Sequence, residues 1–207
     1  MTAVATPKPV SLRRRARLLV WATIAWNGAE AVIALLAGAA ADSGALVSFG
    51  LDSIVEVSAA LVALWYLRGQ HDDRGVVAGR FIALSFWALA SWVSLHAVGD
   101  LFAGNKPEHS VVGIVLTSAS LIVMPWLALA KRQNGETLAS KTLVSESKQT
   151  AVCAYLSGAV LVGLGLNAFA GLWWADSVAA LVVAAVAARE GIEAWRGELL
   201  TEQGCCG

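Results

Sequence analysis

Two acidic residues four positions apart interrupt an otherwise apolar stretch, FGLDSIVEVSAALVALWY, which runs from Phe49 to Tyr66. If this stretch is helical, the side chains of Asp52 and Glu56 lie one turn apart on the same face. Like charges at that spacing repel each other, and burial among apolar groups disfavours both charged forms. A bound divalent cation would offset both penalties, so the pair predicts a cation site.

The alternative is a structural role, in which each acid pairs with a Lys or Arg of another segment. No basic residue falls deep enough in any apolar stretch to form such a pair well. Ionisable groups at membrane depth generally face the protein interior and mark ion paths. The sequence therefore favours the cation site over the ion pairs.

A second polar pair with the same spacing occurs in the sequence SESKQTAVCAYLSG, where Gln149 and Cys153 are four residues apart and Glu146 precedes them. A thiolate together with carboxylates suits zinc and other borderline-soft metals better than magnesium or calcium. Alone, a cysteine in a membrane helix is usually a small packing residue. The acid pair of the earlier stretch is what makes Cys153 a candidate ligand.

The composition places these residues in a membrane protein. The chain has 207 residues, of which 57% are hydrophobic and 14% charged, whereas a soluble domain carries roughly a quarter charged residues. The net charge is zero, so no basic field indicates nucleic acid as a partner. The lipid bilayer is therefore the expected environment.

Apolar runs of about 20 residues predict six transmembrane helices. The last run is too long for one helix, and Gly171-Leu172-Trp173-Trp174 divides it into a hairpin. Residues 132–140 are expected to form a cytoplasmic loop. The predicted spans are Leu18–Ala40, Ala45–Leu67, Phe81–Ala103, Val111–Ala130 and the two halves of Thr150–Ala188.

The fold class is accordingly an all-α membrane protein, a bundle of six transmembrane helices at residues 17–198. It is flanked by an N-terminal arm at 1–16 and a tail at 199–207. Of the 15 Lys and Arg residues, all except Lys106 fall on one side of the predicted membrane. The positive-inside rule therefore predicts that both termini are cytoplasmic. We expect a multi-pass protein of the plasma (inner) membrane.

Other polar residues have two interpretations each. Asn27 and Glu30 in the first span either line an ion or proton path or bond to each other. His96 and Asp100 in the third span either form a local hydrogen bond, which we favour, or belong to a metal site near the outer face.

The last apolar run and the tail contain three further candidate residues. Asp176 is expected to cap the sixth helix. The adjacent thiols of Cys205 and Cys206 either hand a soft metal toward the membrane site or belong to an end without a role, because two ligands cannot complete a tetrahedral zinc site.

The polar pairs, the six spans and the sequence WWADSVAALVVAAVAAREGIEAW resemble the cation diffusion facilitator family, also called the cation efflux proteins. The likeness covers Arg17 to Arg196. It implies a homodimer that exchanges zinc or a related metal for protons. Most members carry a cytoplasmic metal-binding domain after the sixth span, which is not expected here.

The resemblance also assigns site residues. Members typically have Asp or His and then Asp in the second span, where this chain has Asp52 and Glu56. In the fifth span they typically have His and then Asp, at the positions of Gln149 and Cys153, and often an acid at the position of Glu146. Replacing His by Gln removes a nitrogen ligand and an obvious proton carrier near neutral pH.

The sequence therefore predicts a secondary transporter that exports a divalent transition metal, with Zn²⁺ as cargo and no organic cofactor. Asp52, Glu56 and Cys153 are the expected ligands, and Gln149 contributes an oxygen. Proton antiport follows because metal binding displaces protons from acids and thiol. The alternative is a metal sensor or assembly partner that does not transport. A thiol enzyme is not favoured, because no histidine is placed to activate Cys153.

Overall fold

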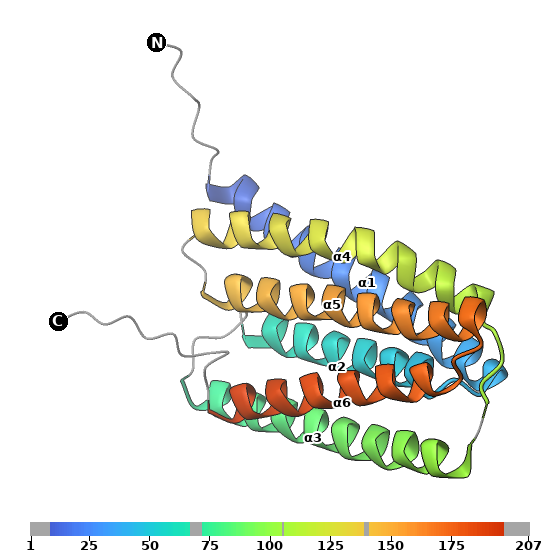
Figure 1. Ribbon diagram of the computed structural model, residues 1–207. Helices are drawn as coiled ribbons and strands as arrows, with labels where there is room; N and C mark the ends of the chain where they lie inside the picture. Colours follow the sequence, from blue (N-terminus) through green and yellow to red (C-terminus); the bar gives the residue numbers. More distant parts are fainter. Residues whose placement is uncertain (1–8, 67–71, 105, 139–140, 197–207) are drawn as a thin grey trace.

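A computed structural model describes residues 9–66, 72–104, 106–138 and 141–196 of the chain. Within these residues the chain folds into six helices joined by short connections, as the sequence predicts (Figure 1). The helices are α1 (Pro9–Ala41), α2 (Gly44–Tyr66), α3 (Asp72–Ala103), α4 (Val111–Thr137), α5 (Lys141–Ala170) and α6 (Trp174–Trp195).

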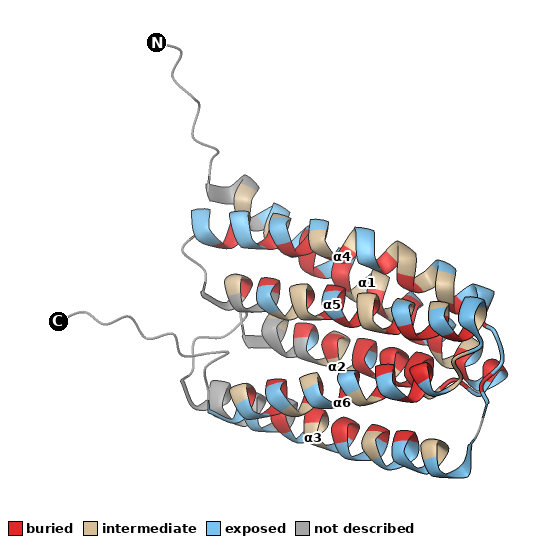
Figure 2. Cartoon of the chain, in the orientation of Figure 1, coloured by how far each residue is buried: buried red, intermediate tan, exposed pale blue. Residues whose placement is uncertain are grey.

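The helices form two layers, with α4, α5 and α6 side by side in one and α1, α2 and α3 in the other (Figure 1). Helix α2 packs against α1, α3, α5 and α6, so it is surrounded on most sides. We call the end of the bundle where α1 begins and α6 ends the terminal end, and the opposite end the far end. Buried residues face the space between the layers (Figure 2).

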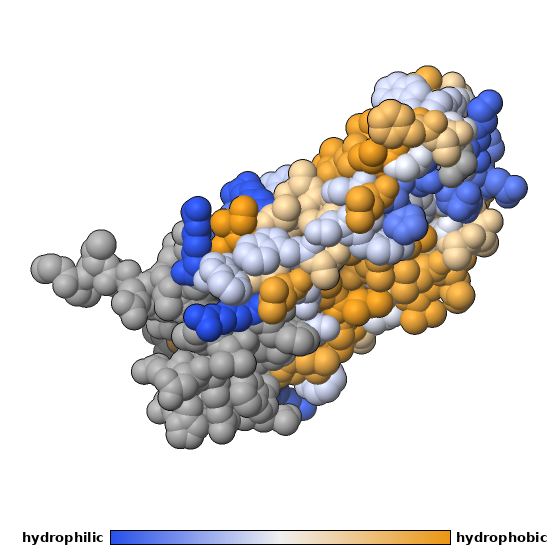
Figure 3. All heavy atoms as spheres, turned by 90° about the horizontal axis from the view of Figure 1, so that it is seen from below, coloured by the Kyte–Doolittle hydropathy of each residue, from blue (hydrophilic) through white to orange (hydrophobic). Residues whose placement is uncertain are grey.

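Four of the described helical segments are long and apolar enough to cross a membrane: Arg14–Ala41, Ala83–Ala103, Val111–Thr137 and Ser147–Ala170. The other two helices, α2 and α6, carry the buried acids Asp52, Glu56, Asp176 and Glu190. Large apolar side chains such as Leu36, Phe102 and Phe169 point outward. Apolar surface covers the middle of the face in Figure 3, with charged residues toward its ends, as expected for a lipid-facing bundle.

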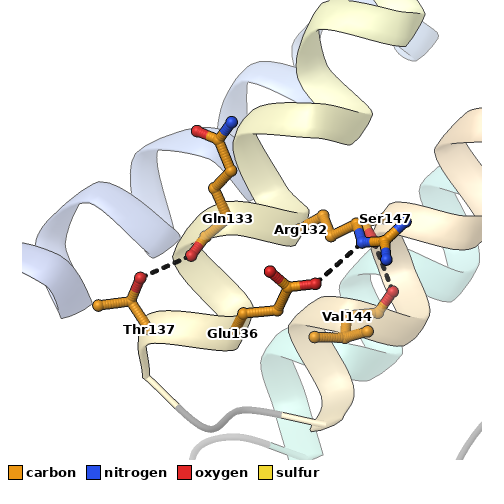
Figure 4. Close-up of polar contacts among 6 residues, drawn as sticks. All are labelled: Arg132, Gln133, Glu136, Thr137, Val144 and Ser147. Carbon is orange, nitrogen blue, oxygen red and sulfur yellow. Dashed lines mark hydrogen bonds and ion pairs between the residues drawn. The ribbon is translucent and has the colours of Figure 1, made fainter.

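Helix α4 is longer than its apolar run, so the prediction of a loop over residues 132–140 is wrong. The helix continues to Thr137, and α5 begins at Lys141, before the predicted span that starts at Thr150. Arg132 and Glu136 form an ion pair of 2.9 Å between Nε and Oε1, and the Thr137 hydroxyl donates to the carbonyl of Gln133 at 2.7 Å (Figure 4). These residues are polar but favour helix, so the helix extends beyond the apolar run.

Asp176 caps a different helix from the one predicted. Its Oδ1 accepts from the Ser43 hydroxyl at 2.5 Å and its Oδ2 from the Ala45 amide at 3.1 Å, while the Leu46 amide donates to Ser43 Oγ at 3.2 Å. The N-cap residue of α6, Trp173, makes no side-chain capping bond. The first amides of α2 lack helical acceptors, so Asp176 and Ser43 together satisfy those of Ala45 and Leu46, and Asp176 ties α6 to α2 at the far end.

Helices α5 and α6 pack closely at Gly163. A Cβ atom placed there would lie 2.6 Å from the Cβ of Ala179 and 3.1 Å from the carbonyl oxygen of Ala175. Small residues allow this approach, which is common between membrane helices.

Candidate metal site

Helices α2 and α5 bring the two polar pairs of the sequence to one cavity inside the bundle. Asp52 and Glu56 of α2 face Gln149 and Cys153 of α5 across this cavity. Its volume is about 10 Å³, the room of a single water molecule. Apolar walls complete it, formed by Phe86, Val152, Val186 and Ala187.

The cavity groups are shielded from solvent. Asp52 is 6% exposed, Glu56 5% and Cys153 1%. Among the residues that the structure describes, Glu56 Oε2 and Gln149 Nε2 are buried without a hydrogen-bond partner. A buried polar atom without a partner is costly, so Glu56 Oε2 and Gln149 Nε2 are the cavity atoms whose hydrogen bonding or coordination is still open.

A third carboxylate, which the sequence analysis missed, lines the same cavity. Glu190 of α6 is 6% exposed and faces the cavity together with Asp52. Its neighbour Gly191 lets α6 approach α3, since a Cβ atom there would lie 2.5 Å from Trp87 Cδ1. In the sequence, Glu190 follows Arg189 just after the last apolar run. A charged residue at that place is expected to be exposed to solvent, so it was not considered as a site residue.

A buried lysine also lies close to the cavity, although its place at the end of an apolar run did not suggest this. Lys131 of α4 is 1% exposed, and its Nζ donates to the hydroxyl of Thr150 at 3.0 Å. Thr150 Oγ1 in turn donates to Glu56 Oε1 at 3.1 Å. The ammonium group therefore connects to Glu56 through this hydroxyl.

The two polar residues of the first span do not line the cavity, and they do not bond to each other. The carboxylate of Glu30 accepts hydrogen bonds from Ser53 at 3.0 Å and from Ser120, so it joins α1 to α2 and α4. The Asn27 side chain is buried and has no hydrogen-bond partner among the described residues.

His96 and Asp100 lie in a separate cavity of about 220 Å³ at the far end, which Asp42 also lines. The ring of His96 stacks against Trp92 with centroids 4.2 Å apart. The structure therefore separates this pair from Asp52 and Glu56.

Three further candidates fall outside the described part of the chain. Glu146 belongs to α5, but its side chain is not described, and Cys205 and Cys206 follow the last described residue.

The cavity can supply three carboxylates, a thiol and an amide to a ligand. Among the described side chains, no group of three or more His, Cys, Asp and Glu residues already has the geometry of a metal centre. The donor types nevertheless match a borderline-soft cation, since the set combines carboxylate oxygens with sulfur. Binding such an ion would require these side chains to draw together.

The chain matches the description "Cation efflux transmembrane domain" over residues 20–197. It belongs to the cation efflux family. The match spans almost all of the described helices, so the resemblance inferred from the polar pairs is confirmed. No curated protein matches the chain.

Membership in the cation efflux family makes the protein an integral membrane transporter of cations by type, and not a typical enzyme. The cavity between α2, α5 and α6 brings together three buried carboxylates, those of Asp52, Glu56 and Glu190, with the thiol of Cys153.

Proposed function

We propose that this cation efflux protein exports a divalent transition-metal ion, with zinc as its preferred cargo, in exchange for protons. The supporting observation is the cavity that Asp52, Glu56 and Cys153 share deep in the bundle. In the proposed bound state these three side chains coordinate the ion through two oxygens and one sulfur. Zinc accepts such a mixed set and needs only four ligands.

Gln149 supplies the fourth ligand in this proposal. Its amide nitrogen is buried at the cavity without a hydrogen-bond partner among the described residues. Rotating the side-chain amide by half a turn would put its oxygen in the place of the nitrogen, and no hydrogen bond of the nitrogen to a described residue would be broken. Glu190, on the opposite wall, adds negative charge that attracts the ion.

Proton exchange follows from the chemistry of these ligands. A metal ion binds the thiolate and the carboxylate forms, so its arrival releases protons. Protons that enter from the outside then compete for the same groups and release the metal. In this scheme the two ends of the bundle open alternately around the cavity, and a proton gradient drives export.

The Asp52→Asn variant tests the proposal. Asn has nearly the same volume and removes one of several neighbouring negative charges, so the fold should be retained while zinc binding and uptake into proteoliposomes are lost. The exposed Asp42 offers a matched control, and Asp42→Asn should leave both unchanged. Undiminished zinc uptake by Asp52→Asn would reject the site. A fall of several kcal/mol in stability would instead indicate a broken structural pair.

The alternative function is a metal sensor or assembly partner that binds without transporting. This alternative is favoured by the residues of the fifth helix. The family resemblance leads one to expect His and Asp at the positions where this chain has Gln149 and Cys153. Zinc binding to the purified protein without uptake into proteoliposomes would establish this alternative.

The organisation of the working protein is also part of the proposal. We propose a homodimer in the plasma membrane with both termini in the cytoplasm, built from the bundle at residues 17–198. Cys205 and Cys206 in the tail at 199–207 would assist metal delivery from the cytosol.

A further inference from the structure

The buried lysine and threonine beside the cavity have no role in the proposed coordination, although they contact one of its ligands. Lys131 comes from α4 and Thr150 from α5, and they connect to Glu56 of α2 by bonds of 3.0 and 3.1 Å. All three side chains are nearly inaccessible to solvent. A charged group at such depth is expensive, so a function for it is expected.

The donor and acceptor properties of these groups fix the direction of the chain of bonds. An ammonium group has only hydrogens to donate, so the hydroxyl of Thr150 must use a lone pair to accept from Lys131. The same hydroxyl donates its hydrogen to Glu56 Oε1 at 3.1 Å. Lys131 thus makes Thr150 a donor toward the carboxylate.

This arrangement treats the two carboxylate oxygens of Glu56 differently. Oε1 is occupied by the hydroxyl, whereas Oε2 is buried and has no hydrogen-bond partner among the described residues. Oε1 has already committed one lone pair to this bond, so Oε2 is the oxygen that a cation meets without competing with a described donor. A carboxylate held in this way binds an ion through one oxygen instead of chelating it through both.

The number of oxygens that a carboxylate offers matters for the choice of metal. Zinc prefers four ligands in a tetrahedral arrangement. Manganese favours oxygen ligands and an octahedral shell, so it gains more from a carboxylate that can supply a second oxygen. A relay that withholds Oε1 keeps the coordination number low.

We propose that Lys131 and Thr150 are positioning residues that make Glu56 a one-oxygen ligand and thereby favour Zn²⁺ over Mn²⁺. This inference rests on the proposed function of the cavity. The ammonium acts through the hydroxyl and does not bind the metal.

The test measures the affinities of the purified full-length protein for Zn²⁺ and for Mn²⁺ by equilibrium dialysis and takes their ratio. Uptake of each ion into proteoliposomes is measured on the same proteins. Thr150→Val removes the hydroxyl at nearly constant shape, and Lys131→Met removes the ammonium. Each should reduce the preference for Zn²⁺ about tenfold, the size of one hydrogen bond to a charged group. The double variant should lose no more than either single one, because both act on one relay.

Thr150→Ser is the matched control, since it keeps the hydroxyl and should retain the preference. If Lys131 and Thr150 had only a structural role, the variants would bind Zn²⁺ and Mn²⁺ more weakly by the same factor, and the ratio of the two affinities would not change. If Lys131→Met does not fold, Thr150→Val alone decides. An unchanged ratio in a protein whose wild type binds and takes up metal would overturn this inference only. A wild type that binds neither ion would overturn the proposed function as well.

Discussion

The sulfur of Cys153 is the softest ligand atom at the cavity. Cys153 is 1% exposed and lines the cavity together with Asp52 and Glu56. The Cys153→Ser variant should therefore bind zinc and cadmium at least tenfold more weakly but change manganese binding much less, because a hydroxyl is a harder and poorer ligand than a thiolate. Equilibrium binding of the three ions to the purified variant checks this expectation.

Cys153→Asp extends the same experiment. It restores the acid that the family resemblance leads one to expect and should favour a harder ion such as manganese. Equal losses for all three ions in Cys153→Ser would mean that the thiol packs the core and does not bind metal.

Some residues of the candidate site could be predicted from the sequence and others could not. Asp52, Glu56, Gln149 and Cys153 are visible because each pair repeats at the helical spacing within an apolar context. Glu190 was missed, since its direction depends on the close contact of α6 with Trp87, which no spacing encodes.

Lys131 was missed for another reason. It stands at the end of an apolar run, where the positive-inside rule explains any lysine without reference to a site. Only the packing of α4 against α5 shows that its ammonium turns inward to Thr150.

At the scale of the helices, the contact between α5 and α6 depends on Gly163. The Gly163→Ala variant should lower the stability of the bundle by about 1–3 kcal/mol, because the added methyl group meets the Cβ of Ala179 and a backbone carbonyl, and neither can move aside. Thermal unfolding in detergent measures the effect.

Gly165 on the same helix provides the control. No atom lies within 4 Å of a Cβ placed there, so Gly165→Ala should keep or raise the stability through its better helix propensity. Equal stability of the two variants would show that α5 and α6 do not need this close contact.

The existence and order of the helices followed from the sequence, but their ends did not. An apolar run reports the length that lies in lipid, whereas α4 continues through polar residues to Thr137. Asp176 shows the same limit, because a side chain near the start of one helix can cap another when the two starts meet in space.

The whole molecule has a predicted orientation that two exposed positions near the opposite ends of α4 can test. Glu136 and Lys106 lie near the two ends of that helix and are both exposed. With Cys205 and Cys206 changed to Ser, Glu136→Cys should react with an impermeant maleimide only from the cytoplasmic side, and Lys106→Cys only from outside. Reaction of both cysteines from the same side would contradict a membrane-crossing α4. The reversed pattern would show that the protein has the opposite orientation in the membrane.

The size of the cavity has a consequence for the time course of transport. A space of about 10 Å³ accepts a bare ion but not one that keeps its shell of water. If Asp52 and Glu56 bind the cargo as proposed, an ion must lose its water before it reaches them. Magnesium dehydrates reluctantly and usually keeps several waters in protein sites. On that proposal, the narrow cavity should discriminate against magnesium by its rate of entry, before the affinity of the ligands has any part in the selection.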